Sequence, residues 1–336
     1  MKKFFLIFCF FVFVGFLFIY FFKSKTCITP NTLNVKKEIV GNDLTKTFLN
    51  LSSKKDFLLF LDSNKNISRT FFEVVKSNNN NIYQQKTDEL YMLLSNQYYD
   101  SVYFSLQKDF PDISKIFDEI NLAIHNFNKE SHIKKNPVVN ILISGFYNDI
   151  VVTHDTINIG IDYFLQFNNS YKPRDFPTYI LKRYTPEFLI PTTLISYFSQ
   201  FNLMDTNDES LLNEMIAFGK LYYVVSELLP CVDENIILGY DKEELKILEK
   251  TETFIYSYFI QNELFFEKNH LTKNKYINER PNIFEISSNH PGRIARWLGW
   301  KIVKSYIKSN PHTTLEELLY NKDHLKIFYN STYKPL

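Results

Sequence analysis

The sequence predicts a helix-dominated α+β fold, a single globular domain with a small antiparallel β-sheet, preceded by an N-terminal hydrophobic anchor helix. Three observations predict this fold. An uncharged apolar run occupies residues 4–22, and helical periodicity covers most of the remaining chain. One region, residues 138–161, is instead rich in β-branched residues. We therefore expect a signal-anchor or signal segment over 1–26, a polar linker over 27–44 and the α+β domain over 45–336.

The composition narrows the class of protein. Of the 336 residues, 45% are hydrophobic and 22% are charged, which excludes a wholly disordered chain. The formal net charge is +1, so no overall field attracts nucleic acid, and we expect no nucleic-acid partner. Seven histidines and three cysteines argue against a multi-zinc protein or a disulfide scaffold.

The N-terminal run from Phe4 to Phe22 is long enough to cross a membrane. As a helix it would span about 28 Å, against a hydrocarbon core of roughly 30 Å. An uncleaved signal-anchor fits this run better than a cleaved signal peptide, which has a shorter apolar stretch and small residues before the cut. The two lysines on each flank, at 2–3 and at 23 and 25, give no orientation.

Cys27 is a candidate lipidation residue, as in a bacterial lipoprotein cut just before a cysteine. Lys25 does not suit the small or apolar positions that such a cut requires. Either outcome tethers a globular body to a membrane. We interpret Cys9 as an anchor residue and Cys231 as a small core residue, while a Cys27–Cys231 disulfide stays open.

Helices are predicted from apolar spacing and from capping residues. A helix follows Pro111 and Asp112, with apolar residues every three or four positions as far as residue 127. Asp208 opens a second helix that Pro230 stops. Two further helices begin at predicted capping boxes, which are Asp241 with Glu244 and Thr314 with Glu317.

Three short segments are predicted to form the sheet. Residues 138–144, 150–153 and 157–161 are β-branched and apolar, and residues 154–156 form a tight connection between the last two. Consecutive short strands of this kind indicate an antiparallel meander of three strands.

The sequence offers no catalytic, cofactor-binding or metal-binding residues by motif. No two of the histidines, at 125, 132, 154, 270, 290, 312 and 324, lie three or four residues apart, which excludes a zinc site on one helix. No nucleophile elbow, P-loop or dinucleotide-binding fingerprint occurs. Four charged residues lie beside apolar ones and are interpreted as structurally paired charges: Asp162, Arg183, Glu187 and Glu214.

The stretch from Ser287 to Ile307 is the most distinctive in the chain. Pro291 suits the first turn of a helix, and an apolar row at four-residue spacing follows it. Both tryptophans of the chain and several basic residues lie around the other side. Two interpretations stay open, a solvated amphipathic helix or a basic and aromatic surface for a partner. That surface would comprise Arg293, Arg296, Trp297, Trp300, Lys301 and Lys304.

Five ordered stretches resemble the gliding-motility lipoprotein GldB family of the Bacteroidetes. They lie at residues 143–167, 171–191, 211–240, 290–306 and 329–335, and the resemblance covers about residues 45–336. The most specific parts are the Pro-Gly-Arg helix with its Gly-Trp pair and the Tyr-Lys-Pro terminus. The beginning of the chain departs from the family, because its apolar run is longer and the residues before Cys27 suit lipidation poorly.

The resemblance implies a non-enzymatic, membrane-tethered protein of the cell envelope, an accessory component of the gliding and type IX secretion machinery. It implies partners among other envelope proteins and a body that faces the periplasm. The anchor would lie in the inner membrane if it is uncleaved, and in the outer membrane if Cys27 is lipidated. The alternative is a cryptic or inactive zincin-like hydrolase that binds peptide or cell-wall material, although the chain has no H-E-x-x-H motif.

Overall fold

The computed structural model describes residues 35–49, 51, 53–75, 80–96 and 98–335. The anchor predicted over residues 1–26 and the candidate lipidation residue Cys27 lie outside this range. Within it, no helix is both long enough and apolar enough to cross a bilayer.

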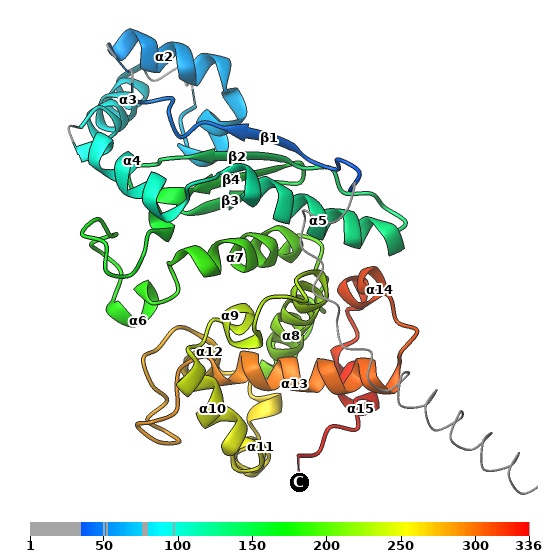
Figure 1. The fold of residues 1–336 in the computed structure, drawn as a ribbon. Helices are drawn as coiled ribbons and strands as arrows, with labels where there is room; N and C mark the ends of the chain where they lie inside the picture. The colour runs from blue at the N-terminus through cyan, green and yellow to red at the C-terminus, as the bar shows by residue number, and fades with distance from the viewer. Residues whose placement is uncertain (1–34, 50, 52, 76–79, 97, 336) are drawn as a thin grey trace, which may run out of the picture.

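A four-stranded mixed sheet lies near one end of the molecule, in the order β1-β2-β4-β3 (Figure 1). The first three strands in this order run parallel to one another, and β3 pairs antiparallel with β4. The strands are β1 (Val40–Asp43), β2 (Val138–Leu142), β3 (Ile150–Val152) and β4 (Thr156–Gly160).

The predicted antiparallel meander is confirmed in part: its three segments are strands, and the last two pair antiparallel as predicted, but the first segment is not paired with the second. β2 pairs directly and in parallel with β4, while β3 turns back onto the outer edge of β4. The reason is burial. All five residues of β4 and four of the five in β2 are buried, whereas β3 is only half-buried. Strands that are covered on both faces typically belong inside parallel arrays.

The described part of the predicted linker belongs to the domain. Val40–Asp43, inside the range 27–44, forms β1 and pairs with β2 from Val138 onward. All four residues of β1 are exposed, so the segment resembles a connector in sequence. It is nevertheless a strand, because the edge of β2 supplies its hydrogen bonds.

A ladder of asparagines crosses the three parallel strands in register. The Asn42 amide donates to Asn140 at 2.8 Å, and the Asn140 amide donates to Asn158 at 2.7 Å. Asn140 and Asn158 are buried, and a buried amide without partners destabilises a fold. The ladder therefore favours this register, because a slip by one residue would separate the amides.

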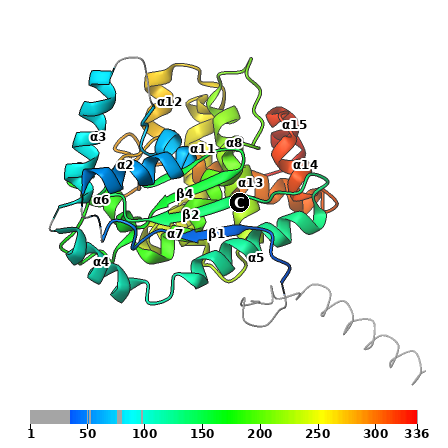
Figure 2. The same cartoon turned by 90° about the horizontal axis from the view of Figure 1, so that it is seen from above.

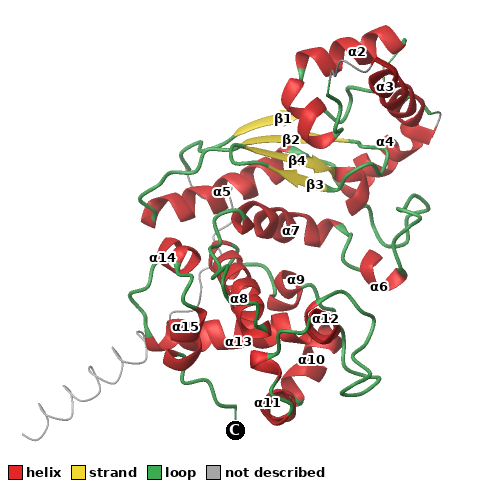
Figure 3. Ribbon diagram, turned by 180° about the vertical axis from the view of Figure 1, so that it is seen from behind, coloured by secondary structure: helices red, strands yellow, loops and turns green. Residues whose placement is uncertain are grey.

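Helices cover both faces of the sheet. Figure 3 shows α2 and α3 on one side of the sheet and α5 and α7 on the other, and in the view from above in Figure 2 α2 lies in front of the strands. The N-terminal elements are α2 (Lys54–Ser63), the π-helical segment η2 (Ile67–Phe71), α3 (Asn80–Leu94) and α4 (Tyr98–Asp109). The elements that follow are α5 (Ser114–Glu130), the 3-10 segment η3 (Ile161–Phe164), α6 (Thr178–Leu181) and α7 (Pro186–Ser199).

A further helical layer lies beyond α5 and α7 and contains the C-terminal half of the chain (Figure 1). Its two long helices are α8 (Leu211–Leu228) and α13 (Ile294–Ser309). Shorter elements surround them: α9 (Glu234–Leu238), α10 (Lys242–Lys250), α11 (Glu252–Gln261), η4 (Leu264–Phe266), α12 (His270–Ile277), α14 (Leu315–Tyr320) and α15 (His324–Asn330).

The two long helices approach each other at a pair of glycines. A Cβ on Gly299 would overlap the carbonyl group of Met215 in α8, and a Cβ on Gly219 would overlap the carbonyl group of Gly299. Only glycine allows main chains to approach this closely. The crossing point of α8 and α13 is therefore fixed by these two residues.

The local signals for helix ends are largely confirmed. Both predicted capping boxes are present, at the starts of α10 and α14. The second predicted helix ends at Leu228, two residues before Pro230, but it begins at Leu211 with Ser210 as its cap. The helix predicted to include Pro291 in its first turn begins instead at Ile294. Arg293, the residue before the helix, has a left-handed φ of 60°, so the helical conformation does not extend back to Pro291.

We expect the substitution Gly299→Ala to lower the free energy of unfolding by at least about 2 kcal/mol. Alanine is favoured over glycine inside a helix by about 1 kcal/mol, but here the added methyl group meets main-chain atoms that cannot move aside. Urea unfolding of the full chain in detergent measures the change. Ser309→Ala, at an exposed position on the same helix, is the control and should change stability by less than about 0.5 kcal/mol. A Gly299→Ala variant as stable as the wild type would contradict the close approach.

Candidate functional site

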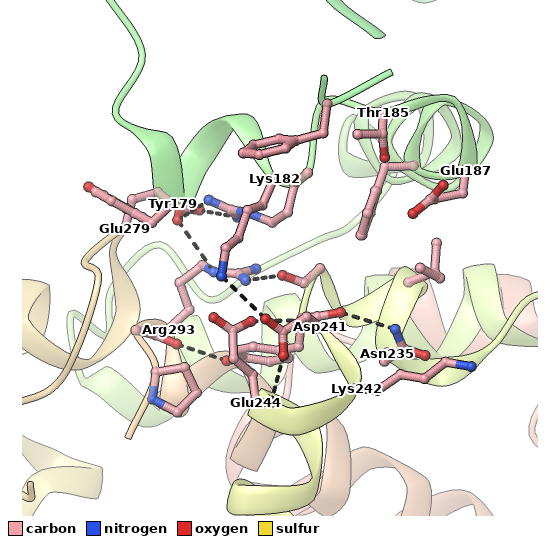
Figure 4. Close-up of a pocket in the computed structure, with 18 of the residues that line it drawn as sticks. Tyr179, Lys182, Thr185, Glu187, Asn235, Asp241, Lys242, Glu244, Glu279 and Arg293 are labelled. Atoms are coloured by element: carbon pink, nitrogen blue, oxygen red, sulfur yellow. Dashed lines mark hydrogen bonds and ion pairs between the residues drawn. The ribbon is translucent and has the colours of Figure 1, made fainter. Parts of the chain in front are cut away.

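A pocket of about 460 Å³ lies between the start of α7, the connection from α9 to α10 and the segment before α13 (Figure 4). Its lining includes five basic and four acidic side chains. The basic residues are Lys182, Arg183, Lys242, Arg280 and Arg293, and the acidic residues are Glu187, Asp241, Glu244 and Glu279.

One carboxylate organises three arginines beside this pocket. Arg183 binds Glu279 through both terminal nitrogens, at 2.9 and 2.5 Å. Arg293 Nε lies 3.4 Å from the same carboxylate, and Arg296 Nη1 lies 3.6 Å from it. Burial alone would raise the pKa of Glu279, but the hydrogen bonds from Arg183 and the three positive charges outweigh burial and lower it. Glu279 is therefore held as an anion.

Arg293 is strained and buried, and it joins two loops. It is 6% exposed and has φ 60°, which is uncommon for a residue other than glycine. Its guanidinium donates to the carbonyl oxygens of Leu238, at 3.0 Å, and of Gly239, and it lies 4.6 Å from the centre of the Tyr240 ring. Gly239 has φ 72° and ends α9, and a Cβ there would meet the guanidinium. The arginine thus satisfies the last carbonyl groups of α9.

The remaining acidic groups at the floor of the pocket take part in the capping of α10. Asp241 accepts the amide of Glu244 at 2.8 Å, and Glu244 accepts the amide of Asp241 at 2.9 Å. Lys182 Nζ lies 3.3 Å from Asp241 (Figure 4). In this view Thr185 and Glu187, at the start of α7, lie on the side away from Glu279.

The predicted basic and aromatic partner surface does not hold for its central residues. Trp297 is fully buried, Trp300 is 3% exposed and Arg293 is buried, because α13 packs against α8, α12 and α15 on several faces. The Arg296 side chain is 17% exposed and donates to the carbonyl oxygen of Ile277 at 2.6 Å. The apolar row predicted for this helix is confirmed, with Ile294, Leu298, Ile302 and Tyr306 all buried.

Lys301 and Lys304 are the accessible members of the predicted surface. Lys301 Nζ is 2.8 Å from Glu252, and Lys304 Nζ is 2.6 Å from Glu234. Lys304 also covers the Trp300 ring, with its nitrogen 4.5 Å from the ring centre. Their role in contacting a partner stays a prediction.

Three of the four charges interpreted as structurally paired are buried or half-buried, and they differ in how they are satisfied. Arg183 pairs with Glu279, and Glu214 pairs with Lys273 at 2.5 Å, as predicted. Glu187 is instead exposed. Asp162 is fully buried, and the contact partners described for it are the amides of Ser144 and Phe146, at 2.8 and 2.7 Å, and the Ser144 hydroxyl.

The Asp162 carboxylate fixes the loop that follows β2. Gly145 and Phe146 in this loop both have left-handed backbone conformations, with φ of 68° and 60°. Burial raises the pKa of Asp162, while the two amides and the hydroxyl of Ser144 oppose that rise. A second cavity, of about 630 Å³ and rich in aromatic side chains, borders this loop. Its charged rim is sparse, and the pocket beside Glu279 is the better candidate for a functional site.

The positions of the histidines, the acidic residues and Cys231 bear on the predictions for metal binding and for the core. Within the described residues, no group of three or more histidine, cysteine, aspartate or glutamate side chains is arranged to hold a metal ion. Cys231 is exposed and forms a disulfide bond, so its interpretation as a small core residue is wrong. The other two cysteines, Cys9 and Cys27, lie outside the described residues.

A comparison with family models matches residues 25–335 to the family described as gliding motility protein GldB. The match covers nearly the whole body together with the segment that precedes it, and the chain belongs to this family. Membership implies a motility lipoprotein anchored to a membrane of the cell envelope, and the family is not a known enzyme family. Comparisons with curated proteins and with solved structures gave no match.

We expect Glu279→Gln to lower the free energy of unfolding by about 1–3 kcal/mol at pH 7, because three arginines lose their anionic partner. The pKa of Glu279 is below its ordinary value of 4.5, so its stabilisation is complete above that pH and is lost as the pH falls through the lowered pKa. The difference between wild type and variant should therefore stay constant from pH 8 to about 5.5 and shrink in more acidic solution.

Urea unfolding at a series of pH values tests this expectation. Glu243→Gln, an exposed carboxylate in the first turn of α10, is the control and should cost less than about 0.5 kcal/mol at any pH. If the two variants lost stability equally, Glu279 would not be the organising carboxylate.

Proposed function

We propose that the chain is a non-catalytic, membrane-tethered component of the gliding and type IX secretion machinery. Its body faces the periplasm and binds another envelope component through the pocket beside Glu279. Membership of the gliding motility family over residues 25–335 supports the cellular role. The charged pocket on the body supports a role in binding.

The state of Glu279 is the observation that favours binding over catalysis. A carboxyl group that transfers protons near neutral pH has a raised pKa, whereas the three arginines lower the pKa of Glu279. Asp241 and Glu244 are used to cap α10. The pocket thus holds fixed charges, which suit the recognition of a charged group.

The disulfide at Cys231 supports the periplasmic placement of the body. Disulfide bonds persist in oxidising compartments such as the periplasm and are rare in the cytosol. The membrane depends on the N-terminus. An uncleaved anchor places the protein in the inner membrane, and lipidation of Cys27 would place it in the outer membrane.

Exchange of two exposed lysines on the rim of the pocket tests the role in motility. We expect the double variant Lys182→Glu and Lys242→Glu, placed in the chromosome, to reduce colony spreading several-fold with protein levels unchanged. Both side chains are at least half exposed, so folding should be preserved. The control is Lys246→Glu with Lys250→Glu, two exposed positions farther along α10 that do not line the pocket. Normal spreading of the pocket variant would contradict the proposal.

Mass spectrometry of the mature protein tests the anchor. We expect an N-terminus that retains residues 1–26 and an unacylated Cys27, because the apolar run is long and Lys25 suits lipidation poorly. Peptide mapping without reduction identifies the cysteine bound to Cys231. An acylated Cys27 at the N-terminus would show instead that the protein is a processed lipoprotein.

A further inference from the structure

The hydroxyl group of Thr185 is buried in the wall of the pocket without a partner. Thr185 is 5% exposed, and no described atom is within hydrogen-bonding reach of its hydroxyl. It stands at the N-cap of α7, where a threonine usually accepts an amide of the first turn, but its side chain makes no such bond. A buried hydroxyl without a partner is costly, and because Thr185 lines the pocket, a ligand that enters the pocket would supply the missing partner.

The start of α7 adds favourable electrostatics. The helix has 14 residues, and its positive end faces the pocket beside Thr185. Pro186 occupies the first position and has no amide proton. The amide of Glu187 has no acceptor within the helix, as at any helix start. Such an end provides donors and partial positive charge for an anion.

The lining of the pocket has one more basic side chain than acidic ones, five against four. Lys182 and Lys242 reach the rim from two separate elements, and Arg183, which is bound to Glu279, lines the wall. Lys182 lies 3.3 Å from Asp241 and Lys242 lies 3.5 Å from Asp233, but both pairs are exposed to solvent and such pairs are weak. Glu279 is neutralised by arginines, and Asp241 and Glu244 cap α10. The one remaining acid of the lining, Glu187, is exposed.

We propose that this pocket binds a phosphate group, with the Thr185 hydroxyl and the first turn of α7 as hydrogen-bond donors and the two rim lysines as counter-charges. A phosphate carries nearly two negative charges at neutral pH, which two lysines match, and it accepts several hydrogen bonds at once. The proposal rests on the pocket as the binding site of the proposed function. It does not depend on the gliding role.

Thr185→Val is the decisive variant, because it removes the hydroxyl and keeps the shape of the side chain. The variant should be as stable as the wild type or more stable, since it loses an unsatisfied buried group. The stabilisation of the full chain in detergent by inorganic phosphate is measured by thermal unfolding, with chloride at matched ionic strength as the reference. We expect the apparent affinity for phosphate to fall about tenfold in the variant.

Thr193→Val is the matched control. Thr193 lies on the same helix and also has a buried, unpartnered hydroxyl, but it does not line the pocket. This variant should bind phosphate like the wild type. Glu187→Gln should bind it more tightly, because a like charge at the start of α7 is removed.

Two further ligands define the class of anion. Glycerol 3-phosphate, a soluble model of a lipid headgroup, distinguishes an esterified from a free phosphate, and binding of either supports the proposal. Acetate that stabilises the chain as well as phosphate does would overturn it. So would equal phosphate binding by wild type and Thr185→Val, or equal losses in the two threonine variants. If phosphate did not bind but the double lysine variant still lost colony spreading, the proposed function would be supported and phosphate would be excluded as the ligand.

Discussion

The architecture depends on the contact of main chain with main chain where α8 and α13 cross at Gly219 and Gly299. Because neither position tolerates a side chain, the two helices have one distance and one crossing point. The adjacent Lys220 reinforces the layer. Its buried ammonium group donates to the carbonyl oxygens of Leu203, Leu319 and Asn321, so α8 also holds the segments that flank α7 and α14.

The same contact positions the charged pocket. Arg293 and Arg296 lie at the beginning of α13, so the place of that helix determines where their guanidinium groups meet Glu279. Arg293 then ties this start to the end of α9 through two carbonyl groups. The packing of α8 against α13 therefore fixes the position of this side of the pocket. The left-handed conformation of Arg293 is stabilised by its contacts with the end of α9 and with Glu279.

Local signals in the sequence predicted local structure well. The capping boxes of α10 and α14 each depend on two residues three positions apart, so the interacting groups lie within one helical turn and can be predicted from local sequence. Three of the four strands and the antiparallel pairing of β3 with β4 were also predicted, but the parallel neighbours of β2 were not. The strand β1, a parallel neighbour of β2, lies about a hundred residues earlier in the chain, and all four of its residues are exposed. Its sequence therefore has no apolar pattern that predicts a strand. The register of the parallel strands depends on hydrogen bonds between Asn42, Asn140 and Asn158. These bonds can be recognised only once the strands are paired.

The candidate site was predicted in part. Arg293 and Arg296 were singled out by their unusual stretch, but a helical wheel shows only one apolar row and cannot show that neighbouring helices bury the other faces. Their organising partner Glu279 and the bidentate Arg183 lie 96 residues apart in the chain, and no spacing rule connects them. Because both tryptophans are buried, the outside of α13 presents no aromatic surface, whereas a charged pocket lies at its beginning. The accessible charges there are the rim lysines together with Glu187 and Asp241, so the pocket presents charged groups to solvent, which the buried tryptophans of α13 do not.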